Sequence, residues 1–223
     1  MKKSLFTIIA LMAIGTVRAQ IAQTDSNYVE VGVNTLRVVS ILIDDKPTDF
    51  DVWNPYLFTL EGHVKRLGIR GGFGQDARKV EQIPTAANGK VRVKTDTSRV
   101  DYRIGLDWEF HLHRRWSVRF GVDYFAAKTT SNMETEFLNE DNVEVKTIRE
   151  IKTMEKGLEP FAYFQYHITP RISLGTELLW RVSSSTTDDI DSNSLNEDVL
   201  ERKFEGKKRI VMAPTALFLC ARF

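Results

Sequence analysis

The sequence predicts an all-β fold, an eight-stranded antiparallel up-and-down transmembrane β-barrel with short periplasmic turns and long extracellular loops. Three observations predict it. Apolar and polar residues alternate along eight segments, as they do when successive side chains of a strand point to opposite faces. The connections between these segments alternate between short and long. The N-terminus has the composition of an export signal.

Residues 1–19 predict a secretory signal peptide, and residues 20–223 are expected to form the barrel domain in the outer membrane. Lys2 and Lys3 precede an apolar run at 5–14, and Val17-Arg18-Ala19 is a small-residue cleavage site. The run is shorter than the roughly 20 apolar residues of a membrane-spanning helix. Cleavage removes three basic residues from a chain of formal charge +1, so no strongly basic face remains and no nucleic-acid partner is expected.

Two neighbouring segments show the alternation most clearly. From 100 to 112, apolar residues such as Trp108 alternate with charged ones such as Asp101 and Glu109. Residues 116–126 repeat the pattern over a length that suits the roughly 9 to 11 residues of a tilted membrane strand. The other six predicted strands span residues 28–37, 55–64, 67–74, 158–168, 172–184 and 210–223.

The connections predict which side of the membrane each end of a strand reaches. Residues 65–66, 113–115 and 169–171 are short, whereas 38–54, 75–98, 127–157 and 185–208 are long. Short turns are periplasmic and long loops are external in bacterial outer-membrane barrels, so both termini are expected in the periplasm. Val91, Val93 and Thr95 alternate before the fourth strand, and Val143, Val145 and Thr147 before the sixth. These strands are therefore expected to continue as an extracellular sheet, whose edges would either bind partner strands or form a stiff shield.

The two faces of the predicted strands differ in chemistry. The apolar faces carry aromatic residues near their ends, which predicts girdles of Phe110, Trp116 and Tyr166 at the periplasmic rim and of Tyr102, Tyr124 and Trp180 at the outer rim. The opposite faces carry charges, so the polar side is expected inside. The chain ends in Phe223 after alternating apolar residues, which resembles the signal that the outer-membrane assembly machinery recognises.

Inward charges predict ion pairs inside the barrel. Counting outward from the short turns places Glu61 opposite Arg70, Glu109 opposite Arg119 and Glu159 opposite Arg181, and lets Arg103 reach Asp123 diagonally. Eight strands leave an interior that side chains just fill. The sequence therefore predicts a structural ion-pair network that plugs the interior, made of Glu61, Arg70, Arg103, Glu109, Arg119, Asp123, Glu159 and Arg181.

Motifs that could carry chemistry are weak. His63, His111 and His167 fall on inward positions near the short turns and could bind zinc, but they lie on alternate strands, so simple hydrogen bonding is expected. Asp189, Asp191 and Asn193 imitate half of a calcium loop that then lacks its glycine and its glutamate. All four histidines are expected far from the serines at 183–185, which disfavours a catalytic triad. No catalytic residue, metal ligand or cofactor is expected.

The segments 54–74 and 157–180 and the terminal Arg222-Phe223 resemble the porin-like outer-membrane β-barrel proteins common in Bacteroidota. The resemblance covers essentially the whole chain after the predicted signal, and it implies an architecture without an active-site signature. The leading expectation is a structural or interaction barrel that contacts outer-membrane lipid and lipopolysaccharide, and an envelope or host protein through its loops. The alternatives are a narrow pore for small solutes and an outer-membrane enzyme that modifies lipid.

Overall fold

The computed structural model describes residues 27–43, 54–82, 85–86, 89–138, 144–193, 196–212 and 216–223, so the predicted signal peptide lies outside the described residues. One helix, α2, spans Thr35–Ile43. The strands are β1 (Tyr28–Asn34), β2 (Phe58–Val64), β3 (Leu67–Gln82), β4 (Thr85–Ala86), β5 (Gly89–Lys90), β6 (Arg92–His113), β7 (Trp116–Leu138), β8 (Glu144–His167), β9 (Ile172–Asn193), β10 (Asn196–Met212) and β11 (Phe218–Arg222).

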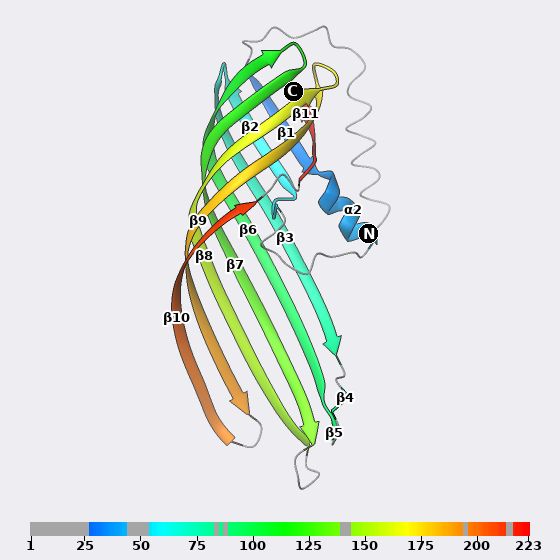
Figure 1. The fold of residues 1–223 in the computed structure, drawn as a ribbon, viewed down its shortest axis with the longest axis vertical. Coiled ribbons are helices and arrows are strands. Elements are labelled where there is room, and N and C mark those ends of the chain that lie inside the picture. The colour runs from blue at the N-terminus through cyan, green and yellow to red at the C-terminus, as the bar shows by residue number, and fades with distance from the viewer. Residues whose placement is uncertain are drawn as a thin grey trace.

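The main sheet closes on itself, as Figure 1 shows. Strands β1, β2, β3, β6, β7, β8 and β9 pair in that order, each antiparallel to the next, and β11 joins β9 back to β1. From β1 to β9 the order of the ring follows the order of its strands in the chain, because hairpins connect antiparallel strands without crossovers. The predicted all-β, antiparallel, up-and-down architecture is confirmed at this level.

The wall of the ring is uneven in height. Strands β1, β2 and β11 have 7, 7 and 5 residues, whereas β6 to β9 have 22 to 24 each. The long strands continue past the ring as an open sheet, here called the extension, formed by residues 75–82, 92–99, 128–138, 144–156, 184–193 and 196–209. The predicted long loops at 75–98, 127–157 and 185–208 are therefore mostly strand. The expected continuation is found for Val93, Thr95, Val145 and Thr147; Val91 precedes β6, and Val143 lies outside the described residues.

The first predicted strand ends early because a helix begins. The side chain of Asn34 accepts a hydrogen bond from the backbone N–H of Arg37 at 3.4 Å, which caps the N-terminus of α2. Arg37 and Ser40 are buried while Leu36 and Val39 are exposed, the period of a helix rather than of a strand. No helix among the described residues is long and apolar enough to cross a membrane.

The last predicted strand is divided into two. Met212 of β10 pairs with Leu179, and Phe218 of β11 pairs with Gly175. Residues 213–217, five in number, separate these two positions in the chain, whereas only the three residues 176–178 separate their partners in β9. A continuous ladder needs equal numbers on both strands. Pro214 lies in this interval and has no N–H to donate to a ladder.

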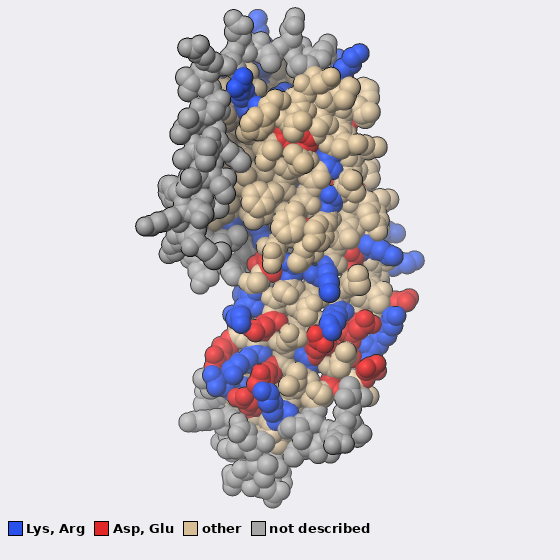
Figure 2. Space-filling view, turned by 180° about the vertical axis from the view of Figure 1, so that it is seen from behind, with Lys and Arg blue, Asp and Glu red and all other residues tan. Residues whose placement is uncertain are grey.

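The ring is polar inside and apolar outside. Trp108, Phe120 and Trp180 are 45%, 51% and 56% exposed, whereas Glu109 and Arg119 are 0% and 1% exposed. On the face that Figure 2 shows, the visible surface of the ring is mostly uncharged with a few charged side chains, and the extension carries mixed charges. The predicted orientation of the two faces is confirmed. The interior is not wholly polar, because it also holds an apolar cluster of Tyr56, Phe161, Tyr163, Leu179, Met212, Ala216, Phe218 and Cys220.

Candidate functional site

The charged interior of the ring is the candidate site. The eight predicted network residues lie on inward positions of β2, β3, β6, β7, β8 and β9, and each is at most 5% exposed. Buried charges are costly unless they are paired and hydrogen-bonded. Three groups of ion pairs supply these partners, at successive levels between the short turns and the extension.

The middle group contains two guanidinium groups and two carboxylates. Arg70 binds Asp123 through Nε at 2.8 Å and Glu177 through Nη1 at 2.6 Å. Arg103 binds Glu177 at 2.8 Å and Asp123 at 3.4 Å. The side chain of Asn54 also donates to Glu177, at 2.8 Å. Formal charges balance at this level, and each carboxylate receives both arginines.

The group nearest the short turns is centred on Arg119. Its guanidinium binds Glu30 at 2.8 Å, forms a closer ion pair with Glu61, and lies 3.8 Å from Glu109. Arg222 adds contacts of 3.4 Å to Glu30 and 3.6 Å to Glu109. Arg119 therefore joins carboxylates from three different strands, β1, β2 and β6.

The group nearest the extension is centred on Arg181. Its guanidinium forms a close ion pair with Glu159, which also accepts a hydrogen bond from the Tyr56 hydroxyl at 2.7 Å. Arg99 binds Asp101 through two hydrogen bonds of 2.9 Å. Arg181 lies 3.9 Å from Asp101, so the two pairs are in contact.

The structure brings some of the predicted pairs together and separates one. Glu159 meets Arg181, Arg103 meets Asp123, and Glu109 meets Arg119 at the longer distance given above. Glu61 and Arg70 are opposite each other in register, as counted from the turn, but the ion pair predicted between them is wrong. Glu61 binds Arg119 and Arg70 binds Asp123 and Glu177, because long side chains reach across a narrow interior to strands that are not neighbours.

The sequence argument missed Glu30 and Glu177, which bind these arginines. The sequence does place both residues on the inward face of their strands, because Glu30 lies between Val29 and Val31 and Glu177 lies between Thr176 and Leu178. That alternation gives the face but not the partner. Each residue lies many positions from the arginine that it binds, so no hairpin count connects them.

Each central arginine also lies over an aromatic ring. The guanidinium carbons of Arg70, Arg103, Arg119 and Arg181 are 3.1, 4.0, 5.1 and 4.0 Å from the centres of the Phe161, Tyr56, Tyr163 and Phe125 rings, respectively. A cation over a ring face is attracted by the quadrupole of the ring, and more strongly when both are desolvated. The apolar cluster therefore packs against the ion pairs and fills the space between them.

A short irregular segment enters the ring at the level of Arg103. Residues 54–57 precede β2 and are not strand, so the strand predicted from Pro55 begins only at Phe58. Tyr56 is 0% exposed, and Asn54 is 2% exposed. A side chain at Gly74 would collide with the backbone of Pro55, so this glycine is required for the close approach. The segment and the arginines together plug the interior.

The three inward histidines do not converge on one another. Nε2 of His111 lies 3.7 Å from Glu109, and Nε2 of His167 lies 3.1 Å from the hydroxyl of Ser117. His63 instead lies with Glu61 and Asp107, and it stacks on Tyr28 with ring centres 4.6 Å apart. A zinc site made of the three histidines is therefore not formed.

The extension has two polar faces. Its inner face presents hydroxyl groups, among them the hydrogen-bonded pairs Thr97 with Ser131 and Thr153 with Thr187. Asp189, which was predicted in an acidic loop, lies in β9 on this face and binds Arg149 at 2.7 Å. The hydrogen bonds from Arg149 lower the pKa of the Asp189 carboxyl below its ordinary value.

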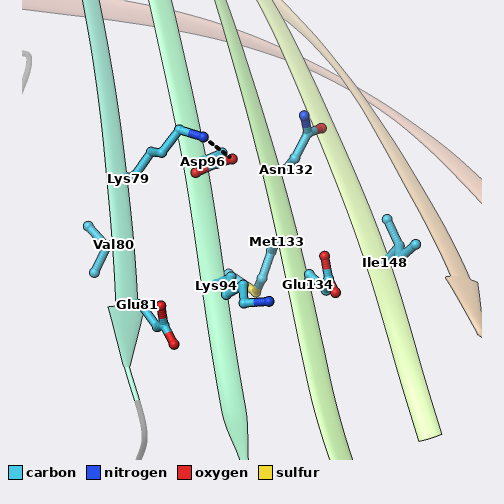
Figure 3. A pocket seen from close by; sticks show the side chains of 9 residues that line it. All are labelled: Lys79, Val80, Glu81, Lys94, Asp96, Asn132, Met133, Glu134 and Ile148. Atoms are coloured by element: carbon cyan, nitrogen blue, oxygen red, sulfur yellow. Dashed lines mark ion pairs between the residues drawn. The ribbon is translucent and has the colours of Figure 1, made fainter.

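The outer face of the extension carries a pocket of about 440 Å³. Figure 3 shows side chains from β3, β6, β7 and β8 around it, with Lys79 and Asp96 joined by an ion pair of 3.3 Å. Glu81 binds Arg92 at 2.7 Å, and Glu134 binds Lys146 at 2.5 Å. Apart from Lys94, the charged residues that line the pocket form ion pairs, which suits a solvated surface better than a binding site for a charged ligand.

Comparison with known proteins adds little. No protein-family model matches the chain, and no curated protein matches it. A solved structure, the crystal structure of Acinetobacter baumannii CarO, is similar over 92% of this chain and 98% of the other, at 8% sequence identity and a TM-score of 0.29. A likeness at that TM-score carries no argument about function, and the resemblance to the Bacteroidota proteins stays an expectation.

Proposed function

We propose that the chain is an outer-membrane β-barrel with a plugged interior, whose role is structural or one of interaction at the surface. The observation that carries the proposal is the inverted polarity of the ring. A closed sheet with large apolar side chains outside and ion pairs inside is stable only where its outer surface meets a solvent less polar than water. Lipid is that solvent, and where β11 joins β9 to β1 the closure leaves no strand edge within it.

The filled interior supports a plug in preference to an open pore. Tyr56, the four central arginines and their carboxylates occupy the ring at successive levels. A conducting pore of this strand number would need space that side chains here take up. We therefore place solute passage second, and the proposal includes no catalytic step.

Cations at the edge of the apolar surface support contact with lipopolysaccharide. Lys128, Lys156, Lys207 and Arg209 are exposed and lie on outward positions where the ring passes into the extension. If the apolar surface spans the hydrocarbon, these side chains lie at the level of the phosphate groups of the outer leaflet. Charge-assisted hydrogen bonds to phosphate are among the stronger polar contacts.

The extension supports an interaction role beyond the membrane. It is an open sheet, and residues 201–209 of its edge strand β10 are exposed on both faces. Basic side chains on an edge strand, such as Lys203, Lys207 and Lys208, disfavour self-association while leaving the edge open to an acidic partner. We propose that an envelope or host protein binds there.

Quenching of tryptophan fluorescence tests the membrane assignment. The full chain is folded into vesicles of ordinary lipid and of lipid brominated along the acyl chain. Trp108, Trp116 and Trp180 are outward and about half exposed, so bromine should quench much of their emission. Replacing either Trp108 or Trp180 by Phe should remove part of the quenched emission, because the other outward tryptophans remain. Emission that bromine leaves unchanged in a folded sample would contradict the proposal.

Two further measurements separate the roles. Recordings in planar bilayers should be silent for the wild-type chain, and stable single-channel conductance would favour the pore. Capture from native membranes should retain a partner with the wild-type chain and lose it when Lys203, Lys207 and Lys208 are replaced by Glu. Mass spectrometry of lipid A from cells with and without the protein should show no difference, and a changed lipid A would favour the enzyme.

A further inference from the structure

We propose that Glu61 and His63 of β2 and Asp107 of β6 form a divalent metal site inside the ring, near its short turns. One ligand atom of each residue lies within 4.8 Å of the other two. Nε2 of His63 is 3.5 Å from Asp107 Oδ1 and 3.8 Å from Glu61 Oε2. Tetrahedral zinc with nitrogen and oxygen ligands at about 2.1 Å separates neighbouring ligand atoms by about 3.4 Å. The observed separations suit an ion between the groups better than direct hydrogen bonds, which are shorter.

Two of the three groups that would bind the ion, His63 and Asp107, have no hydrogen-bond partner in the described part of the chain, whereas Glu61 also forms an ion pair with Arg119. Neither ring nitrogen of His63 and neither carboxylate oxygen of Asp107 makes a hydrogen bond there, and both side chains are 0% exposed. Buried polar atoms are rarely left in this state, and an exception points to an ion, a water molecule or a proton. The Tyr28 ring stacks on the imidazole at an interplanar angle of 11° and holds its plane.

A glycine makes room for the site. β3 separates β2 from β6, and the registers place Gly68 between His63 and Asp107. A Cβ atom at this position would lie 2.5 Å from Cε1 of His63 and 2.6 Å from Oδ1 of Asp107. Because Gly68 has no side chain, groups that are two strands apart approach each other over its backbone.

The local charge balance favours a divalent cation. Four carboxylates lie around Arg119 and His63, those of Glu30, Glu61, Asp107 and Glu109, together with two guanidinium groups, those of Arg119 and Arg222. With neutral histidines, this group carries two excess negative charges. A buried charge without compensation is costly, and one divalent ion removes the excess. A mixed imidazole and carboxylate set suits zinc and similar transition metals.

Zinc binding to the full chain in detergent micelles tests the site. Calorimetry should find about one Zn²⁺ per chain, and Zn²⁺ should raise the midpoint of thermal unfolding relative to EDTA. His63→Gln and Asp107→Asn should weaken the affinity by more than about 100-fold, because loss of even an outer-sphere partner costs about 10-fold to 100-fold. His111→Gln and His167→Gln are matched controls that keep wild-type affinity. Heat-dependent mobility on gels checks that each variant is folded.

Two further measurements distinguish loss of the metal site from loss of stability in the variants. Co²⁺ in the wild-type chain should give the intense visible absorption of a low-symmetry site, which Zn²⁺ then abolishes. In EDTA, Asp107→Asn should be at least as stable as the wild-type chain, because it removes a buried charge that lacks a guanidinium. Absence of stoichiometric Zn²⁺ binding, or retention of it in His63→Gln, would overturn the site and leave a protonated network in its place. Either result leaves the membrane proposal untouched.

Discussion

The ring and the extension are built from the same strands but are stabilised in opposite ways. In the ring, β7 alternates between exposed apolar residues such as Val122 and buried charges such as Asp123. In the extension, the same strand alternates between Asn132 and Met133, and neither side chain is buried. Side chains alternate between the two faces of the strand in both regions. Only a difference in polarity between the two faces indicates that they meet different surroundings. The apolar surface therefore ends where the two faces of the strands become similarly polar, at the start of the extension.

Removal of Arg119 should give the largest effect. Arg119→Met leaves Glu30, Glu61 and Glu109 without their central cation, and loss of one partner of a buried ion pair costs about 3 to 5 kcal/mol. Chemical unfolding in detergent should show this loss. Lys152→Met, which breaks the half-exposed pair with Glu150 in the extension, should change stability by less than about 1 kcal/mol. Equal unfolding midpoints for Arg119→Met and the wild-type chain would refute the stabilising role of the interior ion pairs.

The second largest effect is expected from an arginine placed on the outer face, whose cost in folding free energy should differ between the ring and the extension. Val122→Arg enters the middle of the apolar surface, where an arginine facing lipid costs about 2 to 4 kcal/mol. Asn132→Arg lies on the same face of β7, ten residues further along, and should cost less than about 0.5 kcal/mol. Folding free energies measured in lipid vesicles provide the comparison. Similar costs at both positions would mean that the apolar surface does not meet hydrocarbon.

Acidification should produce the smallest of these effects in the extension. The pKa of Asp189 is lowered by Arg149, so their pair contributes fully above the ordinary carboxyl pKa and is lost as pH falls through the lowered value. Amide exchange along β8 and β9, corrected for its intrinsic rate, should show weaker protection near Arg149 well below the ordinary carboxyl pKa than at neutral pH. Asp189→Asn should remove that difference, and persistence of the difference in the variant would assign it to another group.

Local alternation was sufficient to predict the ring, its inward positions and the outward aromatics. It could not predict the partners of Arg70 and Arg119, because contacts across the interior depend on closure rather than on hairpin register. It underestimated the strands of the extension because hydroxyl and charged residues lack an apolar signal. It also missed α2, since residues 35–37 were assigned to the first strand and residues 38–43 to a long loop.

The meeting of His63 with Asp107 shows a further limit. Both residues were on predicted inward positions, but the sequence shows nothing that joins them. Their proximity depends on Gly68 in the intervening strand, where any larger side chain would collide with both of them. The space that Gly68 leaves can be recognised only from the structure, in which β2 and β6 lie on either side of β3.

The unequal strand lengths affect how a visiting molecule would meet the extension. Among the described residues, β1, β2 and β11 end low, while the opposite wall rises from β3 round to β10, so that part of the chain has the form of a scoop. The hydroxyl-bearing hollow of that scoop faces the low side. A molecule that enters this hollow does so from the low side, so its fit depends on complementarity along the strands and not on the width of an entrance.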